Sequence, residues 1–465
     1  MNDDNDNDGK YTTGAARKRY LTTYQNRLSL EGLPVELHIC ILFKLQDLDS
    51  LRSLVHASPV CYQAYRLVRD EVLLSILRSS YDGHVDISDA VAAVRSRGLY
   101  AIKPSNRAKI IALLDSRRRS EEIRHLGLSS GPFPDQPATV DETIRLLHLH
   151  RMATFLLDDY SRTARCPEWM PPEKWKNEIL PLRLSRTEQR RFFRAFYRMQ
   201  IWGNVFGHIE LPLDADRPEK ENYWFSSRER VPLVFEEEEV WRLFFGTMAP
   251  WEVDEIACFW RHCYHRWEEP YFEISDSLLS YGVTFMSDLP PDEQPPLNRH
   301  WYDCDDLRIR EDENRESLAC MGPSFLVKML RERDFRTRRD LLLANTISWH
   351  HFFHEYWPRP DDGPGALPLL YPADKFNFGT DFNGLKEFLN TLRPHQRPNI
   401  AWTQLWLGAG LDFPEVFVDM FCYAEPSSNW DWGFALWSDE RLMEWGALDQ
   451  PCLRRDVFTP IPEGL

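Results

Sequence analysis

The sequence predicts an all-α, mainly helical protein, with an N-terminal three-helix bundle followed by a larger helical domain with long loops. Two observations predict this class. Apolar residues recur at spacings of three and four along most of the 465-residue chain, whereas the period-two alternation of a strand is scarce. Proline or a capping residue also stands just ahead of many apolar stripes, where helices begin.

The first predicted helix begins at Pro34. Proline suits a first helical turn, because its missing N–H would have no partner there in any case and its fixed φ is helical. Apolar side chains then recur on one face of the helix, at Leu37, Ile41, Leu42 and Leu45.

A second predicted helix follows a short break in this pattern. Gln46–Asp49 interrupts the apolar stripe, and Asp49 or Ser50 is placed to cap the next helix. The apolar positions of this second helix are Leu51, Leu54 and Val55.

The third predicted helix repeats the start of the first. Ser58 supplies a cap and Pro59 a first helical residue, and the stripe ends near Ser79–Ser80. Its apolar face contains Cys61, Ala64, Tyr65, Val68 and Val72. We expect the three helices to form a compact bundle with three side chains partly or wholly buried, namely Leu37, Ile41 and Leu54.

The residues of this region match the F-box pattern: a Leu-Pro-x-Glu-Leu start, an apolar pair four to five residues later, and leucines in the next helix. The matching positions are Leu33, Pro34, Glu36, Leu37, Ile41, Leu42, Leu45, Leu48, Leu51, Leu54 and Val55. The region therefore resembles an F-box, the module that docks substrate receptors onto cullin-RING ubiquitin ligases. Many F-boxes carry a tryptophan in the third helix; this chain has Tyr62 or Tyr65 there, as in a fungal F-box-like variant.

The resemblance implies an adaptor and not an enzyme, with no catalytic residue. Its partners would be the linker protein of the ligase and an unknown protein substrate, which the C-terminal region would bind. The surface for the linker protein is expected to include Leu33, Pro34, Leu37, Ile41, Leu42, Leu45, Leu48 and Leu51. Two alternatives stay open: an F-box-like interaction protein outside any ligase and, least favoured, an enzyme with a site of scattered residues.

Composition and resemblance together predict four regions. Residues 1–27 are expected to form a disordered tail, 28–80 the F-box-like domain, 81–137 a helical linker region and 138–465 a helical substrate-recognition domain. Within the last region, helix starts are predicted at Thr139-x-x-Glu142, Ser185-x-x-Glu188, Pro250 and Pro323. Segments Leu184–Arg198 and Trp432–Gly446 resemble the same fungal proteins, with Ser438 as a cap and Gly446 as a left-handed end.

The net charge of −16 is concentrated in one part of the chain. Residues 210–316 contain 27 acidic and 11 basic residues, and the remainder is neutral. This balance disfavours a nucleic-acid partner, since phosphate binding needs the opposite sign. The acidic middle is a solvated surface or a docking face for a basic partner. A basic stripe, formed by Arg186, Arg190, Arg194 and Arg198, either pairs within the chain or contacts an acidic partner.

No motif predicts a cofactor or a metal. Gly127–Gly131 matches GxSxG by letter but lacks the strand and helix of a nucleophile elbow. One helix face could present three ligand-type side chains, Cys258, His262 and His265, and a second group comprises His350, His351 and His354; we interpret both groups as structural.

The expected location is intracellular, cytoplasmic or nuclear. The nine cysteines are scattered without a CxxC pair, as in a reducing compartment. The chain has no run of 18 apolar residues, so no membrane contact is expected, and residues 1–10 are too polar for a secretory signal.

Overall fold

The computed structural model describes residues 30–125, 136–210, 248–294, 306–346, 396–407 and 428–453, without residues 82, 84 and 208, and also residues 235, 239–240, 243–245, 387 and 389–392. The described chain is all-helical, with 73% helix and no strand, which confirms the all-α class. No helix in this part of the chain is long and apolar enough to cross a membrane. The predicted tail, the GxSxG match and the triple of His350, His351 and His354 lie outside the described residues.

Packing divides the chain into two compact units. Met1–Asp82 and Ala138–Leu147 belong to the first, and Gly83–Pro137 and His148–Leu465 to the second. This grouping differs from the expected one, because most of the stretch expected to be a separate linker region groups with the second unit.

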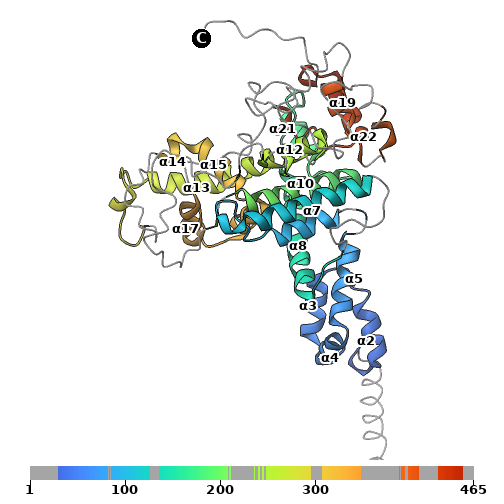
Figure 1. Ribbon diagram of the computed structural model, residues 1–465. Helices are drawn as coiled ribbons and strands as arrows, with labels where there is room; N and C mark the ends of the chain where they lie inside the picture. The colour runs from blue at the N-terminus through green and yellow to red at the C-terminus, as the bar shows by residue number, and fades with distance from the viewer. Residues whose placement is uncertain are drawn as a thin grey trace, which may run out of the picture. The chain divides into compact units, whose positions relative to one another are not determined.

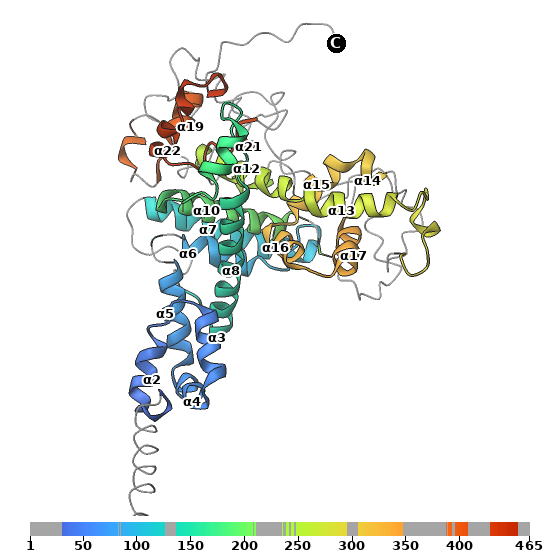
Figure 2. The ribbon, with the colours of Figure 1, turned by 180° about the vertical axis from the view of Figure 1, so that it is seen from behind.

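The first unit is built on short helices. These are η1 (Leu30–Gly32), α2 (Val35–Leu42), α3 (Leu48–Ala57), α4 (Pro59–Leu67) and α5 (Arg69–Tyr81), with the first turns of α8 (Val140–Thr163). Helix α4 packs against both α2 and α3, and the three lie side by side (Figures 1 and 2). At the end of α5 the Tyr81 hydroxyl donates to the carbonyl of Leu146 at 3.1 Å.

The helix boundaries of the first unit differ from the expected ones in three places. Helix α2 ends at Leu42, so Leu45, expected on its apolar face, lies beyond it. Helix α3 is capped by Asp47 and not by Asp49 or Ser50, because Asp47 has an extended backbone and its carboxylate accepts the Ser50 N–H at 2.7 Å. The third predicted helix is two helices, interrupted at Val68. The cap at Ser58 is confirmed, since its hydroxyl accepts the Cys61 N–H.

The side of α2 that faces the bundle explains why Leu37, expected to be buried, is exposed. Ile41 and Leu54 are half-buried, as predicted, but Leu37 is 47% exposed. The inner positions of α2 are taken by His38 and Leu42, one turn apart, which turns Leu37 about 100° away from the interior. The His38 ring fits there because Nε2 lies 2.8 Å from the Leu30 carbonyl oxygen.

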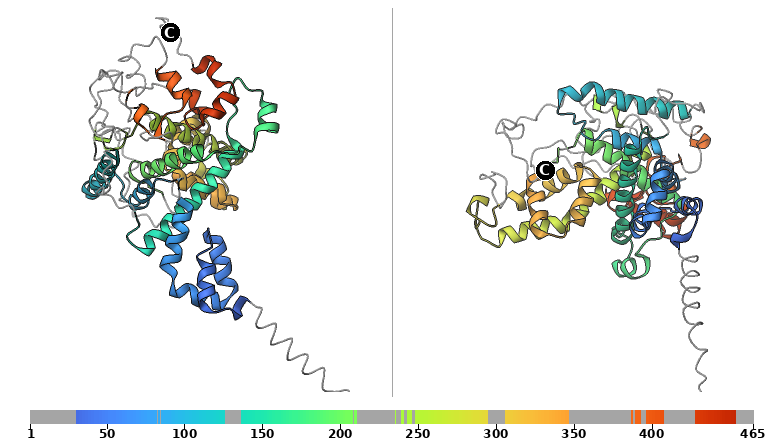
Figure 3. Two further views of the ribbon diagram at one scale, coloured as in Figure 1. Left: turned by 90° about the vertical axis from the view of Figure 1, so that its right-hand side faces the viewer. Right: turned by 90° about the horizontal axis from the view of Figure 1, so that it is seen from below.

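The second unit is organised around α10 (Arg186–Val205) and α12 (Pro250–Arg266). Helix α10 packs against α12 and α6 (Ile87–Arg95), and α12 packs against α15 (Glu311–Cys320) and α21 (Ser428–Asp431). Figure 3 shows these helices from two further sides. The other elements are η2 (Pro104–Asn106), α7 (Arg107–His125), α9 (Pro172–Lys174), η3 (Trp175–Ile179), α13 (Glu268–Leu279), η5 (Met286–Asp288), α14 (Asp306–Ile309), α16 (Pro323–Arg331), α17 (Phe335–Asn345), α19 (Ile400–Leu407), α22 (Asp439–Glu444), η9 (Ala447–Asp449) and η10 (Pro451–Leu453).

Most predicted helix signals of this unit are confirmed. Ser185 and Glu188 form a complete capping box, and prolines 250 and 323 begin α12 and α16. The Ser438 hydroxyl accepts the Arg441 N–H, and Gly446 has φ +65° in the left-handed region. In the first unit, the box at Thr139 has the Thr139 hydroxyl accepting the Glu142 N–H, and the Glu142 carboxylate accepts the N–H of residue 138.

Replacing Leu51 tests the core of the first unit. Leu51→Ala should lower the local free energy of unfolding by about 2–5 kcal/mol, because the side chain is only 4% exposed and leaves a cavity. Native-state hydrogen exchange of the α4 amides measures this value directly. The matched control is Arg52→Ala, an exposed neighbour, which should cost under about 0.5 kcal/mol. Equal losses of stability in the two variants would contradict the placement of Leu51 in the core of the first unit.

Candidate functional site

The surface expected to bind the linker protein lies on the first unit, and its residues divide into three groups. Pro34 and Leu37 are exposed, and Leu42 and Leu51 are buried in the interior of the bundle. The half-buried members are Leu33, Ile41, Leu45 and Leu48. We therefore assign Leu42 and Leu51 to the core of the bundle and keep the other six as the candidate docking surface.

The first unit exposes an unusual share of apolar side chains. Among the described residues, six of the eleven large hydrophobic side chains that are exposed belong to this small unit: Leu30, Val35, Leu37, Phe43, Tyr62 and Leu67. Three of them lie on α2 or at its end, although this helix has only eight residues. Each of these side chains leaves apolar surface in contact with water, which a protein partner could cover.

The basic stripe of α10 is paired inside the second unit. Arg194 binds Glu252 at 2.8 Å and Glu255 at 2.5 Å, and Arg198 binds Glu252 at 2.7 Å and Asp89 at 2.9 Å. Both arginine side chains are nearly buried. The carboxylates come from α12, within the acidic middle, and from α6. Intramolecular pairing, one of the two open alternatives for this stripe, is therefore the one observed for these two arginines.

These ion pairs control the charge of Glu252. Burial raises the pKa of this carboxyl, but the charges of Arg194 and Arg198 outweigh it and hold the pKa at about 2. The spacing of four residues along α10 predicted that the arginines share a face. The sequence could not name their partners, which lie 54 and more positions away.

Glu188 and Arg191 fasten the Trp432–Gly446 segment to α10. The Glu188 carboxylate completes the cap of α10 and also binds Arg441 at 2.6 Å and the N–H of Ser438 at 3.1 Å. Arg191 donates to the Trp437 carbonyl. The segments Leu184–Arg198 and Trp432–Gly446 thus contact each other in the fold.

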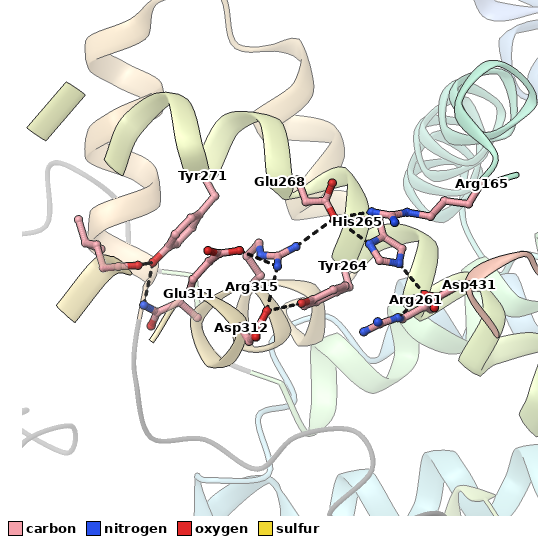
Figure 4. Close-up of polar contacts among 12 residues, drawn as sticks. Arg165, Arg261, Tyr264, His265, Glu268, Tyr271, Glu311, Asp312, Arg315 and Asp431 are labelled. Atoms are coloured by element: carbon pink, nitrogen blue, oxygen red, sulfur yellow. Dashed lines mark hydrogen bonds and ion pairs between the residues drawn. The ribbon is translucent and has the colours of Figure 1, made fainter. Parts of the chain in front are cut away.

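A second polar cluster joins α12, α13, α15 and α21 (Figure 4). His265 lies between two carboxylates, with Nδ1 2.9 Å from Glu268 and Nε2 2.6 Å from Asp431. Arg315 binds Glu311 at 2.7 Å and Asp312 at 2.9 Å, and its guanidinium lies over the Tyr264 ring.

Hydrogen bonds and neighbouring positive charges lower the pKa of two carboxyl groups in this cluster. Burial raises the pKa of Asp431, but hydrogen bonds from His265 and Arg261 reverse the shift, so that the pKa is lowered overall. The same balance, with His265 and Arg165, lowers the pKa of Glu268. The cluster therefore acts as an ionic connection between helices.

A third polar site contains a single carboxyl. Asp254 of α12 is 3% exposed, and it accepts N–H bonds at 2.9 Å from Trp402 of α19 and from Trp430 of α21. Burial raises the pKa of Asp254 to about 7, against the opposite effect of these two hydrogen bonds. Among the described residues, no arginine or lysine pairs with this carboxyl.

The candidate metal ligands do not converge. Cys258 is buried, His262 lies 3.7 Å from Asp159, and His265 is engaged by its two carboxylates. Within the described chain, no group of three or more His, Cys, Asp or Glu side chains is arranged to hold a metal ion. The helical spacing of these three residues therefore places them on α12 without forming a ligand set.

Comparison with known proteins gives no relative: no family model, no curated protein and no solved structure matches this chain. The likeness to an F-box consequently depends on the sequence pattern of residues 33–65 alone. The function has to be argued from the surface and the contacts of the chain itself.

A pair of arginine variants tests the buried ion pairs. Arg198→Ala should lower the free energy of unfolding by about 3–5 kcal/mol, because it leaves Asp89 and Glu252 buried with less charge compensation. Arg162→Ala is the matched control. Its exposed pair with Asp158 should contribute at most about 1 kcal/mol. Urea denaturation followed by circular dichroism measures both, and comparable losses would refute the assignment.

The stability that Glu252 provides should depend on pH. Its pKa in the fold, about 2, is below the ordinary 4.5, so the stabilisation is complete above pH 4.5 and disappears as the pH falls toward 2. The difference in unfolding free energy between the wild type and Glu252→Gln should therefore shrink over that range. A difference that stays constant between pH 5 and pH 2 would show that the ionised carboxylate is not what stabilises the fold.

Proposed function

We propose that the chain is a substrate-recognition adaptor of a cullin-RING ubiquitin ligase. Its N-terminal helices would bind the linker protein of the ligase, and the helical body would hold an unknown protein target for ubiquitin transfer by other subunits. In this role the chain contributes proximity and not acid–base chemistry. The observation that carries the proposal is the exposure of Pro34 and Leu37, at and directly after the start of α2, where the sequence matches the F-box pattern.

The position of these residues supports a docking role. Leu37 and Ile41 are one helical turn apart, and Leu33 and Pro34 stand directly ahead of α2. Leu37 is 47% exposed, so it contributes little to the core of its own bundle. A few apolar anchors of this kind provide most of the free energy of a protein interface when a partner desolvates them.

The second unit supports a binding role as well. At two of the three polar sites the ionisable side chains pair with each other between helices: Arg194 and Arg198 with carboxylates of α12 and α6, and Arg315 with carboxylates of α13 and α15. Such contacts hold helices in register. A rigid helical body suits presentation of a bound protein.

A second candidate function follows from the third helix of the first unit. The tyrosine that stands near the usual F-box tryptophan is Tyr62, which is 47% exposed, or Tyr65, which is half-buried. With a different residue at this site, the same bundle could bind another protein outside any ligase. The two candidates differ in one measurable property, the affinity for the linker protein.

Titration calorimetry with purified linker protein tests the proposal. The wild type should bind with micromolar or tighter affinity. Leu37→Asp should weaken binding at least about thirtyfold, which corresponds to a loss of about 2 kcal/mol at one anchor. The double variant Leu33→Ala, Pro34→Ala should do the same and retain its helical circular dichroism signal.

The matched control for this test is Leu67→Asp. Leu67 is 70% exposed on α4, so the same change is made to a more exposed leucine outside the candidate docking surface. Its affinity should stay within about threefold of the wild type. No binding of the wild type at micromolar linker protein would reject the adaptor and leave the second candidate.

A further inference from the structure

Asp254 lies where three helices of the second unit meet. It belongs to α12, and its two carboxyl oxygens accept N–H bonds from α19 and α21: Oδ2 from Trp402 and Oδ1 from Trp430, both at 2.9 Å. Trp402 and Trp430 are themselves at most 1% exposed. Both donors are neutral, and burial of an ionised carboxylate without a cation is costly. The protonation of this one group therefore affects how firmly two helices are held.

Asp431, which follows Trp430 in α21, is, unlike Asp254, a carboxyl with cationic partners in the described part of the chain. Asp431 is partly exposed and is bound by Arg261 and His265, both at 2.6 Å. Helix α21 is thus attached to α12 by one neutral contact, at Trp430, and one ionic contact, at Asp431. Only the neutral contact involves a carboxyl with no cationic partner among the described residues.

We propose that Asp254 is a proton-linked attachment point, which holds α19 and α21 on α12 while the carboxyl is neutral and loosens them when it ionises. Ionisation inside this site would favour conformations that admit water to the carboxylate. The C-terminal layer would then separate more often from α12 above neutral pH. The inference concerns the second unit alone and does not depend on the proposed function.

The groups that face Asp254 act in both directions. On α12 the charged neighbour is Glu255, a carboxylate that opposes ionisation and is itself bound by Arg194, while Cys258 is a buried thiol. On α19 and α21 the facing groups are the indoles of Trp402, Trp406 and Trp430, and the hydrogen bonds from Trp402 and Trp430 favour ionisation.

The sign of the pH effect follows from the burial of the carboxyl, which outweighs the hydrogen bonds that it accepts. The pKa of Asp254 in the fold, about 7, lies above its ordinary value of 3.8. The contribution to stability is therefore complete below pH 3.8 and is lost as the pH rises through about 7. By this linkage, the equilibrium constant for opening of the site should rise about tenfold between pH 6 and pH 8.5.

The test uses the full chain labelled with 5-fluorotryptophan. The fluorine resonances of Trp402 and Trp430, assigned from Trp402→Phe and Trp430→Phe, should move together with a midpoint near pH 7. Hydrogen exchange of the α19 amides, corrected for the intrinsic rate, should accelerate about tenfold from pH 6 to pH 8.5. Both effects should be absent in Asp254→Asn.

A control variant removes Glu316, a second carboxyl whose pKa is also close to 7. Burial raises the pKa of Glu316 to about 7 as well, and Glu316→Gln should leave both effects unchanged. If Asp254→Asn does not fold, the variant Trp430→Phe tests the proposal in its place. It removes a hydrogen bond that lowers the pKa, so the midpoint seen at Trp402 should move above pH 7. An unchanged or lower midpoint, or a titration that persists in Asp254→Asn, would overturn the proposal.

Discussion

The second unit depends on the ion pairs between α10 and α12. Arg194 and Arg198 extend from one helix to Glu252 and Glu255 of the other at 2.5–2.8 Å, in surroundings almost without water. Charges placed there are tolerated only when their partners are in position, so these contacts penalise any other register of the two helices. Two further helices are held on this pair, α6 through Asp89 and α21 through Asp254 and Asp431.

The same two helices determine where the C-terminal segments lie. Glu188 at the start of α10 holds Arg441, and Asp254 of α12 holds Trp402 and Trp430. These contacts span about 150 to 250 positions of the chain. They explain why a tryptophan-rich stretch far from α10 in sequence forms part of its core.

Local signals in the sequence predicted the helices well. The contacts between residues far apart in the chain could not be predicted from the sequence. Capping at Ser58, Ser185 and Ser438 depends on neighbours within three residues, so the sequence was sufficient. The cap at Asp47 was missed because Asp49 and Ser50 offered equally suitable side chains. The prediction that Leu37 is buried was wrong. Periodicity gives the spacing of the apolar side chains along a helix but does not say which of them face the bundle, and here His38 occupies the inner position.

The candidate docking surface remains a prediction from the sequence. The F-box pattern proposed it on residues 33–51, and the structure separates Leu42 and Leu51, which are buried in the bundle, from the exposed Leu37. The carboxyl at Asp254 was not predicted, because its two tryptophan partners are 148 and 176 positions away and indole N–H groups leave no pattern around an aspartate in the sequence.

Hydrogen exchange of the purified chain with and without the linker protein tests the central claim most directly. The account predicts that the linker protein slows exchange from Leu33 to Leu48, over α2 and the start of α3, and leaves α10 and α12 unchanged. Protection confined to the second unit, or no protection anywhere at saturating linker protein, would contradict it.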